Sequence, residues 1–232
     1  LTHRCIALDL PGYGKSDEVR HPYSMHFFAA TLRAFIAELE LEEVTLVGHS
    51  MGGQIAMHTV LASTENISRL VLVAPAGFET FTEQHQQWFA TYVTPAVVKA
   101  TPDAQIVRNF EINFHDMPDD ARFMIDDRME LKASLAYEAY SEMIPQCVSA
   151  MLKEPVFDRL TEIKLPTLVV FGAEDALIPN RFLHPGLSVE EVAQAGVGQL
   201  SQAQLTILPA AGHFVQWEQS AELNKLFTSF AR

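Results

Sequence analysis

The chain is poor in cysteine and in positive charge, and it has no long apolar run. Its 232 residues contain only two cysteines, too few for a disulfide framework, so Cys5 and Cys147 are expected to be reduced thiols of a cytoplasmic protein. No stretch approaches the ~18 consecutive apolar residues of a membrane helix, so no membrane insertion is expected. Lys and Arg number 16 against 29 Asp and Glu, a net charge of −13. That balance disfavours nucleic acid and anionic lipid as partners.

Cofactor motifs are missing as well. No Cys/His cluster has the spacing of a zinc site. The sequence holds no HExxH motif, no P-loop and no GxGxxG pattern after a strand. We therefore expect no metal, nucleotide or haem cofactor. With 48% hydrophobic and 19% charged residues, the composition is that of a folded globular protein and excludes intrinsic disorder.

Strand-like and helix-like patterns alternate along the chain. Apolar strands are expected at 3–10, 43–48, 69–74, 166–171 and 204–208. Helices are expected at 24–41, 51–63, 189–199 and 217–230, with Ser24 as an N-cap. Strands that are apolar throughout are buried on both faces, which is typical of a mostly parallel α/β sheet flanked by helices.

One long segment breaks this alternation. Residues 78–160 are helical in pattern, rich in aromatic residues and methionine, and show no strand. They predict a helical insertion between a first core part, 1–77, and a second core part, 161–232. Its aromatic side chains either line an apolar pocket or pack the helices together. Arg122 and Arg128 either recognise a carboxylate or pair with Asp126 or Asp127.

The strongest chemical signal is the segment GHSMG at 48–52, between an expected strand and an expected helix. A serine on a sharp strand-to-helix turn needs small neighbours, which Gly48 and Gly52 supply. The turn lifts the Ser50 hydroxyl out of the sheet. The helix start places the Met51 N–H where an oxyanion would form. The alternative is a glycine-rich turn whose serine only caps the helix.

A serine hydroxyl is a weak nucleophile and needs a base, which in turn needs an orienting acid. His213 follows the last expected strand, and Asp175 follows the strand at 166–171. Loops at the carboxyl ends of parallel strands line one crevice, so these two side chains and Ser50 should converge. Glu174, adjacent to Asp175, is a competing acid. Because an ordinary histidine titrates near pH ~6.5, a neutral His213 base predicts that kcat/KM rises through that region.

Four segments together carry a family resemblance: DLPGYGKSD at 9–17, GHSMGG at 48–53, PTLVVFGAED at 166–175 and GHFVQWE at 212–218. With them the chain resembles the α/β-hydrolase superfamily, in its cap-bearing branch of serine esterases and carbon–carbon bond hydrolases. The resemblance implies Ser50 as nucleophile, His213 as base and Asp175 as its partner. It implies that 78–160 is a cap over the active site, and that Asp9 and its following glycines form a structural turn. His49, Phe214 and Trp217 are expected to contact substrate.

The chain departs from the family pattern at its beginning. The family has strands before the segment that starts here at His3, and a His-Gly loop among them gives a second oxyanion N–H. We therefore expect a fragment of a longer chain in which Met51 supplies the one oxyanion donor present. A second departure is the long separation of Asp175 from His213, which predicts an enlarged loop and helix at 181–200.

The resemblance leaves three functions open. The leading one is a carboxylesterase that cleaves small or medium apolar esters, a small-molecule substrate, through an acyl-enzyme. The second is a carbon–carbon bond hydrolase of dienoic ring-cleavage products. The QWE stretch at 216–218 looks like that group, whereas His49 stands where many of its members have Asn. The third, from a different class, is a ligand-binding member or fragment without catalysis.

Overall fold

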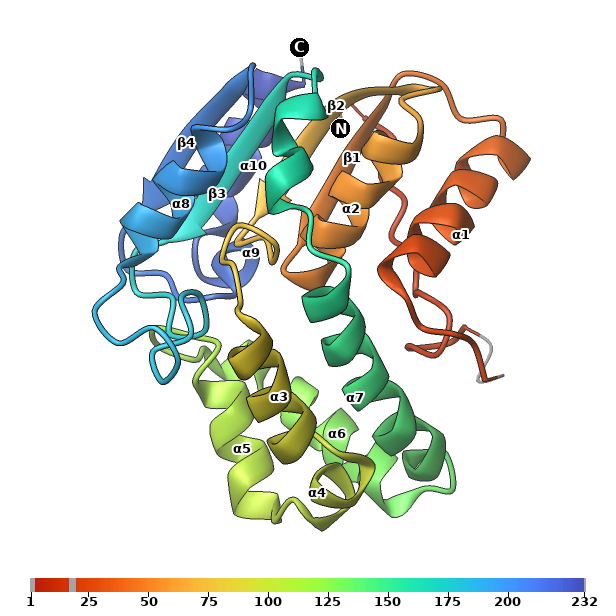
Figure 1. Cartoon of the computed structure of the whole chain (residues 1–232), viewed down its shortest axis with the longest axis vertical. Helices are drawn as coiled ribbons and strands as arrows, with labels where there is room; N and C mark the ends of the chain where they lie inside the picture. The colour runs from red at the N-terminus through yellow and green to blue at the C-terminus, as the bar shows by residue number, and fades with distance from the viewer. Residues whose placement is uncertain (1–2, 17–19, 232) are drawn as a thin grey trace.

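The computed structural model describes residues 3–16 and 20–231. Figure 1 shows a part made of a sheet with flanking helices and, below it, a part made of helices. The elements in chain order are α1 (Met25–Glu38), β1 (Val44–His49), α2 (Met51–Ala62), β2 (Ile67–Val73), α3 (Glu83–Tyr92), α4 (Pro95–Ala100), α5 (Asp103–Glu111), η1 (Asp119–Ala121), α6 (Phe123–Ala133), α7 (Tyr137–Lys153), η2 (Phe157–Glu162), β3 (Thr167–Gly172), α8 (Val189–Val197), β4 (Ala203–Leu208), α9 (Val215–Glu218) and α10 (Ser220–Phe230).

The sheet of the described residues is parallel throughout, with the strand order β1-β2-β3-β4. Val47 is in register with Val71, and Val71 with Leu168. In Figure 1 the carboxyl ends of the strands point toward the helical part. The loops that carry the candidate catalytic residues leave the sheet at this edge, as expected of an open α/β sheet. The expected mostly parallel α/β fold is therefore confirmed.

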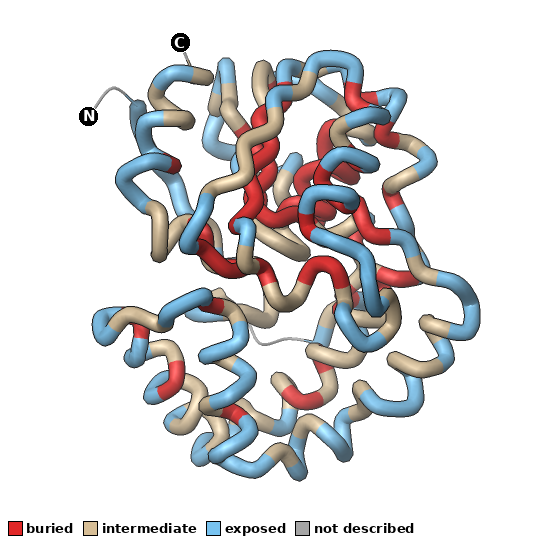
Figure 2. Tube along the Cα trace, turned by 90° about the vertical axis from the view of Figure 1, so that its left-hand side faces the viewer, coloured by how far each residue is buried: buried red, intermediate tan, exposed pale blue. Residues whose placement is uncertain are grey.

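Alternate residues of the strands form two hydrophobic clusters on opposite faces, as the twofold period of a strand requires. On one face Leu72 and Val169 pack with Met57 of α2 and Val192 of α8. On the other face, Val71 and Val170 pack with residues of α10 that include Leu223. Figure 2 shows that the buried residues gather around the sheet, whereas most of the helical part is exposed or half-buried. The stability of the fold therefore rests mainly on the sheet and its flanking helices.

Local sequence signals account for most element boundaries. The Ser24 side chain accepts the Phe27 N–H at 2.9 Å and caps α1, as expected. The final helix differs from the expectation, since it is broken into α9 and α10 at Gln219. The backbone of Gln219 leaves the helical region, with φ −121 and ψ 39. Its side-chain amide donates instead to the carbonyls of Pro209 and Ala210.

The expectation of a buried strand at 3–10 is wrong. Residues 3–10 form no strand, and Ile6 is 42% exposed. A strand needs a hydrogen-bonded neighbour for its backbone groups. In the part of the chain that the structure describes, this segment pairs with none.

The turn after residues 3–10 does form as the glycines predict. Gly12 and Gly14 have φ of 84 and 57, the left-handed region that glycine enters without cost. The Asp9 carboxylate accepts the Lys15 N–H at 3.0 Å. A Cβ on Gly14 would lie 2.3 Å from the Asp9 carboxyl carbon. Asp9 thus holds the turn together, while Asp17 of the same motif lies outside the described residues.

The helical part consists of α3 to α7, and the described residues 78–160 contain no strand. α7 is the central helix, since α1, α3, α4 and α6 all contact it. Most aromatic residues of the helical part pack on one another. The ring centres of Trp88 and Tyr92 lie 5.0 Å apart, and those of the stacked Tyr137 and Tyr140 lie 5.7 Å apart. Others reach residues of the sheet part: Phe114, which is 5% exposed, packs on Phe214, and Phe123 packs on Trp217.

Candidate active site

Ser50 occupies a strained turn between β1 and α2. Its φ of 52 and ψ of −122 lie outside the regions that a residue with a side chain prefers. The backbone is held from several sides: the Ser50 N–H donates to the Val73 carbonyl, and the Ser50 carbonyl accepts from Ala76. The side chain makes no capping hydrogen bond to α2. A serine placed only to cap the helix would use its hydroxyl for that bond, so this geometry disfavours the capping interpretation.

Of the two flanking glycines, only Gly48 is required by contact. A Cβ on Gly48 would lie 2.3 Å from the Gly52 carbonyl oxygen, whereas a Cβ on Gly52 would meet nothing within 4 Å. A third glycine, Gly53, is crowded by Pro75, because a Cβ on Gly53 would lie 2.8 Å from the Cβ of Pro75. The turn is therefore closed by Gly48 and Gly53, which differs from the expected pair Gly48 and Gly52.

Asp175 and His213 lie together at the carboxyl ends of β3 and β4. His213 Nδ1 is 2.8 Å from Asp175 Oδ2, and the two residues are 3% and 0% exposed. The other oxygen, Oδ1, accepts the N–H groups of Leu177 at 2.8 Å and Ile178 at 3.0 Å. A carboxylate can only accept, so Nδ1 of His213 carries a proton, and in the neutral imidazole Nε2 has the lone pair. Nε2 is then the atom that can take a proton.

Glu174 points elsewhere. Its Oε2 accepts the Ala211 N–H at 3.1 Å, which ties the loop after β3 to the loop after β4. β3 and the His213 loop are also in close contact, because a Cβ on Gly172 would lie 2.2 Å from the Ala211 carbonyl oxygen. Glu174 thus supports the loop, and the carboxylate that reaches the imidazole of His213 belongs to Asp175.

His49 joins the Ser50 turn to His213. Its Nε2 donates to the backbone carbonyl of His213 at 2.9 Å, and the two rings lie 4.7 Å apart. Burial, and after it the neighbouring His213, lower the pKa of His49 to about 3. The imidazole is therefore neutral near pH 7. The residue before Ser50 is in this way in direct contact with the loop that carries His213.

Phe214 and Trp217 lie on the side of His213 that faces the helical part. The Phe214 ring is 5.3 Å from that of His49 and 5.0 Å from that of Phe114. Trp217 instead contacts the helical part, where its Nε1 donates to Asp120 Oδ1 at 3.0 Å and its ring packs on Phe123. Both residues therefore stand between the loop that carries His213 and the helices.

Arg128 projects from α6 into a polar cluster. Its guanidinium carbon lies 4.4 Å from the centre of the Tyr140 ring and 5.4 Å from that of Phe110, and it donates to the Tyr140 hydroxyl. Beside it, the Tyr13 hydroxyl donates to Cys147 Sγ at 3.4 Å. Burial raises the pKa of Tyr13, Tyr140 and Cys147, so all three stay neutral. Among the described residues, Arg128 forms no ion pair, with Asp126 and Asp127 included.

Sequence reasoning also missed the role of Glu218. Its carboxylate accepts the Gly212 N–H at 2.7 Å, next to His213. The sequence shows it only as an acid shortly after the histidine, inside the QWE stretch. Its other partners, the N–H groups of His115 and Asp116, lie about a hundred positions away in the sequence, so no local pattern could reveal its role.

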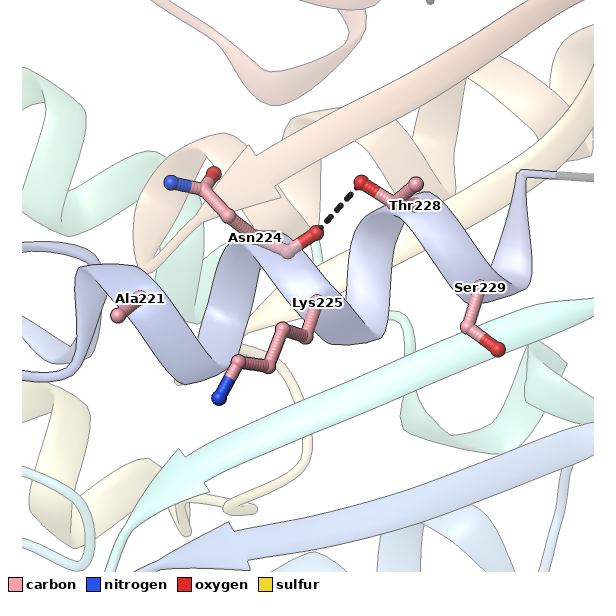
Figure 3. A pocket seen from close by; sticks show the side chains of 5 residues that line it. All are labelled: Ala221, Asn224, Lys225, Thr228 and Ser229. Carbon is pink, nitrogen blue, oxygen red and sulfur yellow. Dashed lines mark hydrogen bonds between the residues drawn. The ribbon is translucent and has the colours of Figure 1, made fainter.

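Other parts of the molecule show less chemistry. A surface hollow of about 390 Å³ lies along α10, lined by Ala221, Asn224, Lys225, Thr228 and Ser229 (Figure 3). It is made by one face of a single helix and holds no nucleophile–base pair. Across residues 3–16 and 20–231, no three His, Cys, Asp or Glu side chains gather as a metal site. No helix in this part of the chain has the length and apolarity to cross a bilayer.

The chain has many relatives of known sequence and structure. It is 28% identical over 99% of its length to the dihydrolipoyllysine-residue acetyltransferase component of an acetoin cleaving system from Pseudomonas putida, of which it spans 56%. It is 27% identical over 98% of its length to a 2-hydroxy-6-oxononadienedioate/2-hydroxy-6-oxononatrienedioate hydrolase from Cupriavidus pinatubonensis, of which it spans 76%.

A solved esterase from Exiguobacterium antarcticum superposes with a TM-score of 0.74. The two are 21% identical, and the superposition covers 96% of this chain and 79% of the esterase. At this identity the likeness shows the shared fold. A family model described as the alpha/beta hydrolase fold matches residues 1–220. The chain therefore belongs to the alpha/beta hydrolase fold family.

Proposed function

We propose that the protein is a serine hydrolase in which Ser50 is the nucleophile, His213 the general base and Asp175 the acid that orients it. The observation that carries this proposal is the strained, uncapped Ser50 turn, joined through His49 to a buried pair of His213 and Asp175. A nucleophile next to a base that is itself oriented by a third group is the arrangement of acyl transfer.

The reaction proceeds in two halves. The Ser50 hydroxyl gives its proton to Nε2 of His213 while its oxygen bonds to the substrate carbonyl carbon, and the carbonyl electrons move to oxygen. The Met51 N–H, at the positive end of α2, donates to this oxyanion. Collapse expels the alcohol, which takes the proton from His213. Water then attacks the acyl-enzyme by the same steps, releasing the acid and Ser50.

The helical part, 78–160, is proposed to be a cap over this site, with 1–77 and 161–232 forming the core. It leaves the core at the carboxyl end of β2, which is the edge of the sheet that points toward the helical part in Figure 1. Phe114 and Asp120 of this part contact Phe214 and Trp217 beside the histidine loop. A cap in this position limits the access of bulk water to the reacting groups and shapes the acyl site.

Carboxylic esters with a small or medium apolar acyl group are the proposed substrates. The Ser50 turn adjoins an apolar cluster, because Met51 packs against the buried cluster that contains Met143, and Tyr13 and Tyr140 pack against the same cluster. Methionine and aromatic side chains adapt to acyl chains of different shape.

A second candidate, hydrolysis of carbon–carbon bonds in dienoic ring-cleavage products, is favoured by Arg128. Such products carry a carboxylate, and the Cupriavidus relative is named as a hydrolase of dioates. Arg128 offers a half-buried guanidinium with no ion-pair partner among the described residues, held by the Tyr140 ring in the cluster that contains Met51. Turnover of a vinylogous diketone that exceeds turnover of a matched ester would favour this candidate over the esterase.

The proposed location is the cytoplasm. Both cysteines are free: Cys5 is exposed, and Cys147 is buried against Tyr13. Free thiols persist in a reducing compartment.

Labelling with a fluorophosphonate, read by intact mass, tests the proposal. Wild-type protein should gain one adduct that is lost in Ser50→Ala. The matched control is Ser63→Ala at the other end of α2, which should label like wild type. Labelling retained in Ser50→Ala would exclude Ser50 as nucleophile. An unlabelled wild type that is nevertheless stabilised by an ester ligand would point to the binding protein without catalysis.

A further inference from the structure

The loop that carries His213 is held by hydrogen bonds to one backbone group of each of three consecutive residues. The Gly212 N–H donates to Glu218 Oε2 at 2.7 Å, the His213 carbonyl accepts from His49 at 2.9 Å, and the Phe214 N–H donates to the Asn113 carbonyl at 2.9 Å. These partners come from three separate elements. Asn113, in the turn after α5, belongs to the helical part, so that part touches the base loop directly.

Glu218 makes a second link to the same turn. Its other oxygen, Oε1, accepts the N–H groups of His115 at 2.9 Å and Asp116 at 2.8 Å. One carboxylate thus satisfies three backbone donors, with Gly212 on one oxygen and the two cap residues on the other. Bonds from N–H groups to a charged acceptor are stronger than bonds between neutral groups.

The packing around these bonds leaves little freedom. A Cβ on Gly212 would lie 2.7 Å from the His115 nitrogen and 2.8 Å from the Asn113 oxygen, so only glycine fits. Phe114 packs edge-on against Phe214, with the ring centres 5.0 Å apart. The backbone of the 113–116 turn therefore lies directly against the residue before His213.

We propose that Glu218 is a positioning residue that couples the seating of the helical part to the placement of His213. The inference rests on the proposed function, in which His213 is the base. When the 113–116 turn is seated, both Glu218 oxygens are filled and Gly212 is fixed. When the turn moves away, Oε1 of Glu218 loses the N–H groups of His115 and Asp116, and the Phe214 N–H loses the Asn113 carbonyl at the same time. The base loop is then held by fewer bonds, and the base reaches its working position only under a closed cap.

Glu218→Gln separates this role from simple packing. The amide keeps the size of the side chain but has one accepting oxygen and one donating nitrogen. Its oxygen can accept either from the Gly212 N–H or from the N–H groups of His115 and Asp116. Its nitrogen would then face the other N–H donors, with which it cannot form a hydrogen bond. The matched control is Asp120→Ala, which removes the other bond between the cap and α9, the one to Trp217 Nε1, and touches no group of the 212–214 loop.

The test follows fluorophosphonate labelling of the full chain over time. In Glu218→Gln the labelling rate should fall about 10-fold to 100-fold, the cost of a base displaced by about 1 Å, while the final labelled fraction matches wild type. Asp120→Ala should stay within about threefold of the wild-type rate. A merely structural role of Glu218 would lower the final labelled fraction instead. An unchanged rate in Glu218→Gln, or equal slowing in both variants, would overturn the inference.

Hydrogen exchange gives a readout that does not depend on activity. In Glu218→Gln, peptides covering 110–117 and 210–216 should both exchange faster, whereas Asp120→Ala should leave 210–216 unchanged. If wild-type protein fails to label at Ser50, the proposed function fails and exchange alone decides the coupling. Faster exchange in only one of the two segments of Glu218→Gln, or in neither, would contradict it.

Discussion

The Nδ1 atom of His213 lies 2.8 Å from Oδ2 of Asp175, and the other oxygen of this carboxylate is filled by the N–H groups of Leu177 and Ile178. Both oxygens of Asp175 are thus hydrogen-bonded, and the residue is 0% exposed. Such a carboxylate fixes both the tautomer and the orientation of the imidazole.

Asp175→Asn should lower kcat by up to about 10⁴-fold with little change in KM. The amide can keep the bonds from Leu177 and Ile178 through its oxygen. Its nitrogen would then face Nδ1, which favours the tautomer with the proton on Nε2. Steady-state kinetics on a chromogenic ester measures this. Glu174→Gln is the matched control and should cost less than about tenfold, because Glu174 bonds Ala211 and not His213. A larger loss in Glu174→Gln than in Asp175→Asn would assign the acid to Glu174.

The two glycines that flank the Ser50 turn should respond in opposite ways. Gly48→Ala should destabilise the protein by about 1–3 kcal/mol, since the new Cβ would lie 2.3 Å from a backbone oxygen. It should also abolish labelling of Ser50. Gly52→Ala places its methyl group in open space on α2 and should be neutral or stabilising by up to about 1 kcal/mol.

Urea denaturation of both glycine variants, at one pH, measures this contrast. Equal destabilisation by the two substitutions would mean that the turn is closed differently from the arrangement described.

Some of these features could be predicted from the sequence, and others could not. The parallel sheet, the helical insertion and the position of Ser50 follow from local patterns of apolar and small residues. The strand expected at 3–10 does not form, since a strand depends on a neighbour and no local pattern supplies one. The roles of Gly53 and Glu218 were also beyond sequence reasoning, because their partners, Pro75 and the 113–116 turn, are set by tertiary packing.

Arg128→Met should discriminate between the two candidate substrate classes. Loss of a charged hydrogen bond costs about 1.5–3 kcal/mol, so KM for a substrate with a terminal carboxylate should rise roughly 10-fold to 150-fold. KM for the matched methyl-terminated ester should change little. Arg122→Met, an exposed cation just before α6, is the control and should leave both values unchanged. Equal effects on the charged and neutral substrates would show that Arg128 serves packing with Tyr140 and not carboxylate binding.

The half-buried imidazole of His49 should make the protein sensitive to acid. Its pKa is lowered to about 3 in the fold, against ~6.5 in an unfolded chain. Between these values the unfolded chain binds a proton that the folded protein does not, so stability rises with pH and is lost as pH falls from 6.5 toward 3. At pH 5.0 the loss from this residue is about 2 kcal/mol, at ~1.4 kcal/mol per pH unit.

His49→Gln should remove this share of the acid sensitivity, because its amide can donate to the His213 carbonyl in place of Nε2 but does not titrate. Urea denaturation at pH 7.5 and pH 5.0 gives the difference for each protein, and the pH 7.5 value corrects for any packing change. The wild-type difference should exceed that of the variant by about 2 kcal/mol. Burial also lowers the pKa of His58, so some acid sensitivity of the same sign should remain in the variant. Identical differences in the two proteins would show that His49 does not stay neutral in the fold.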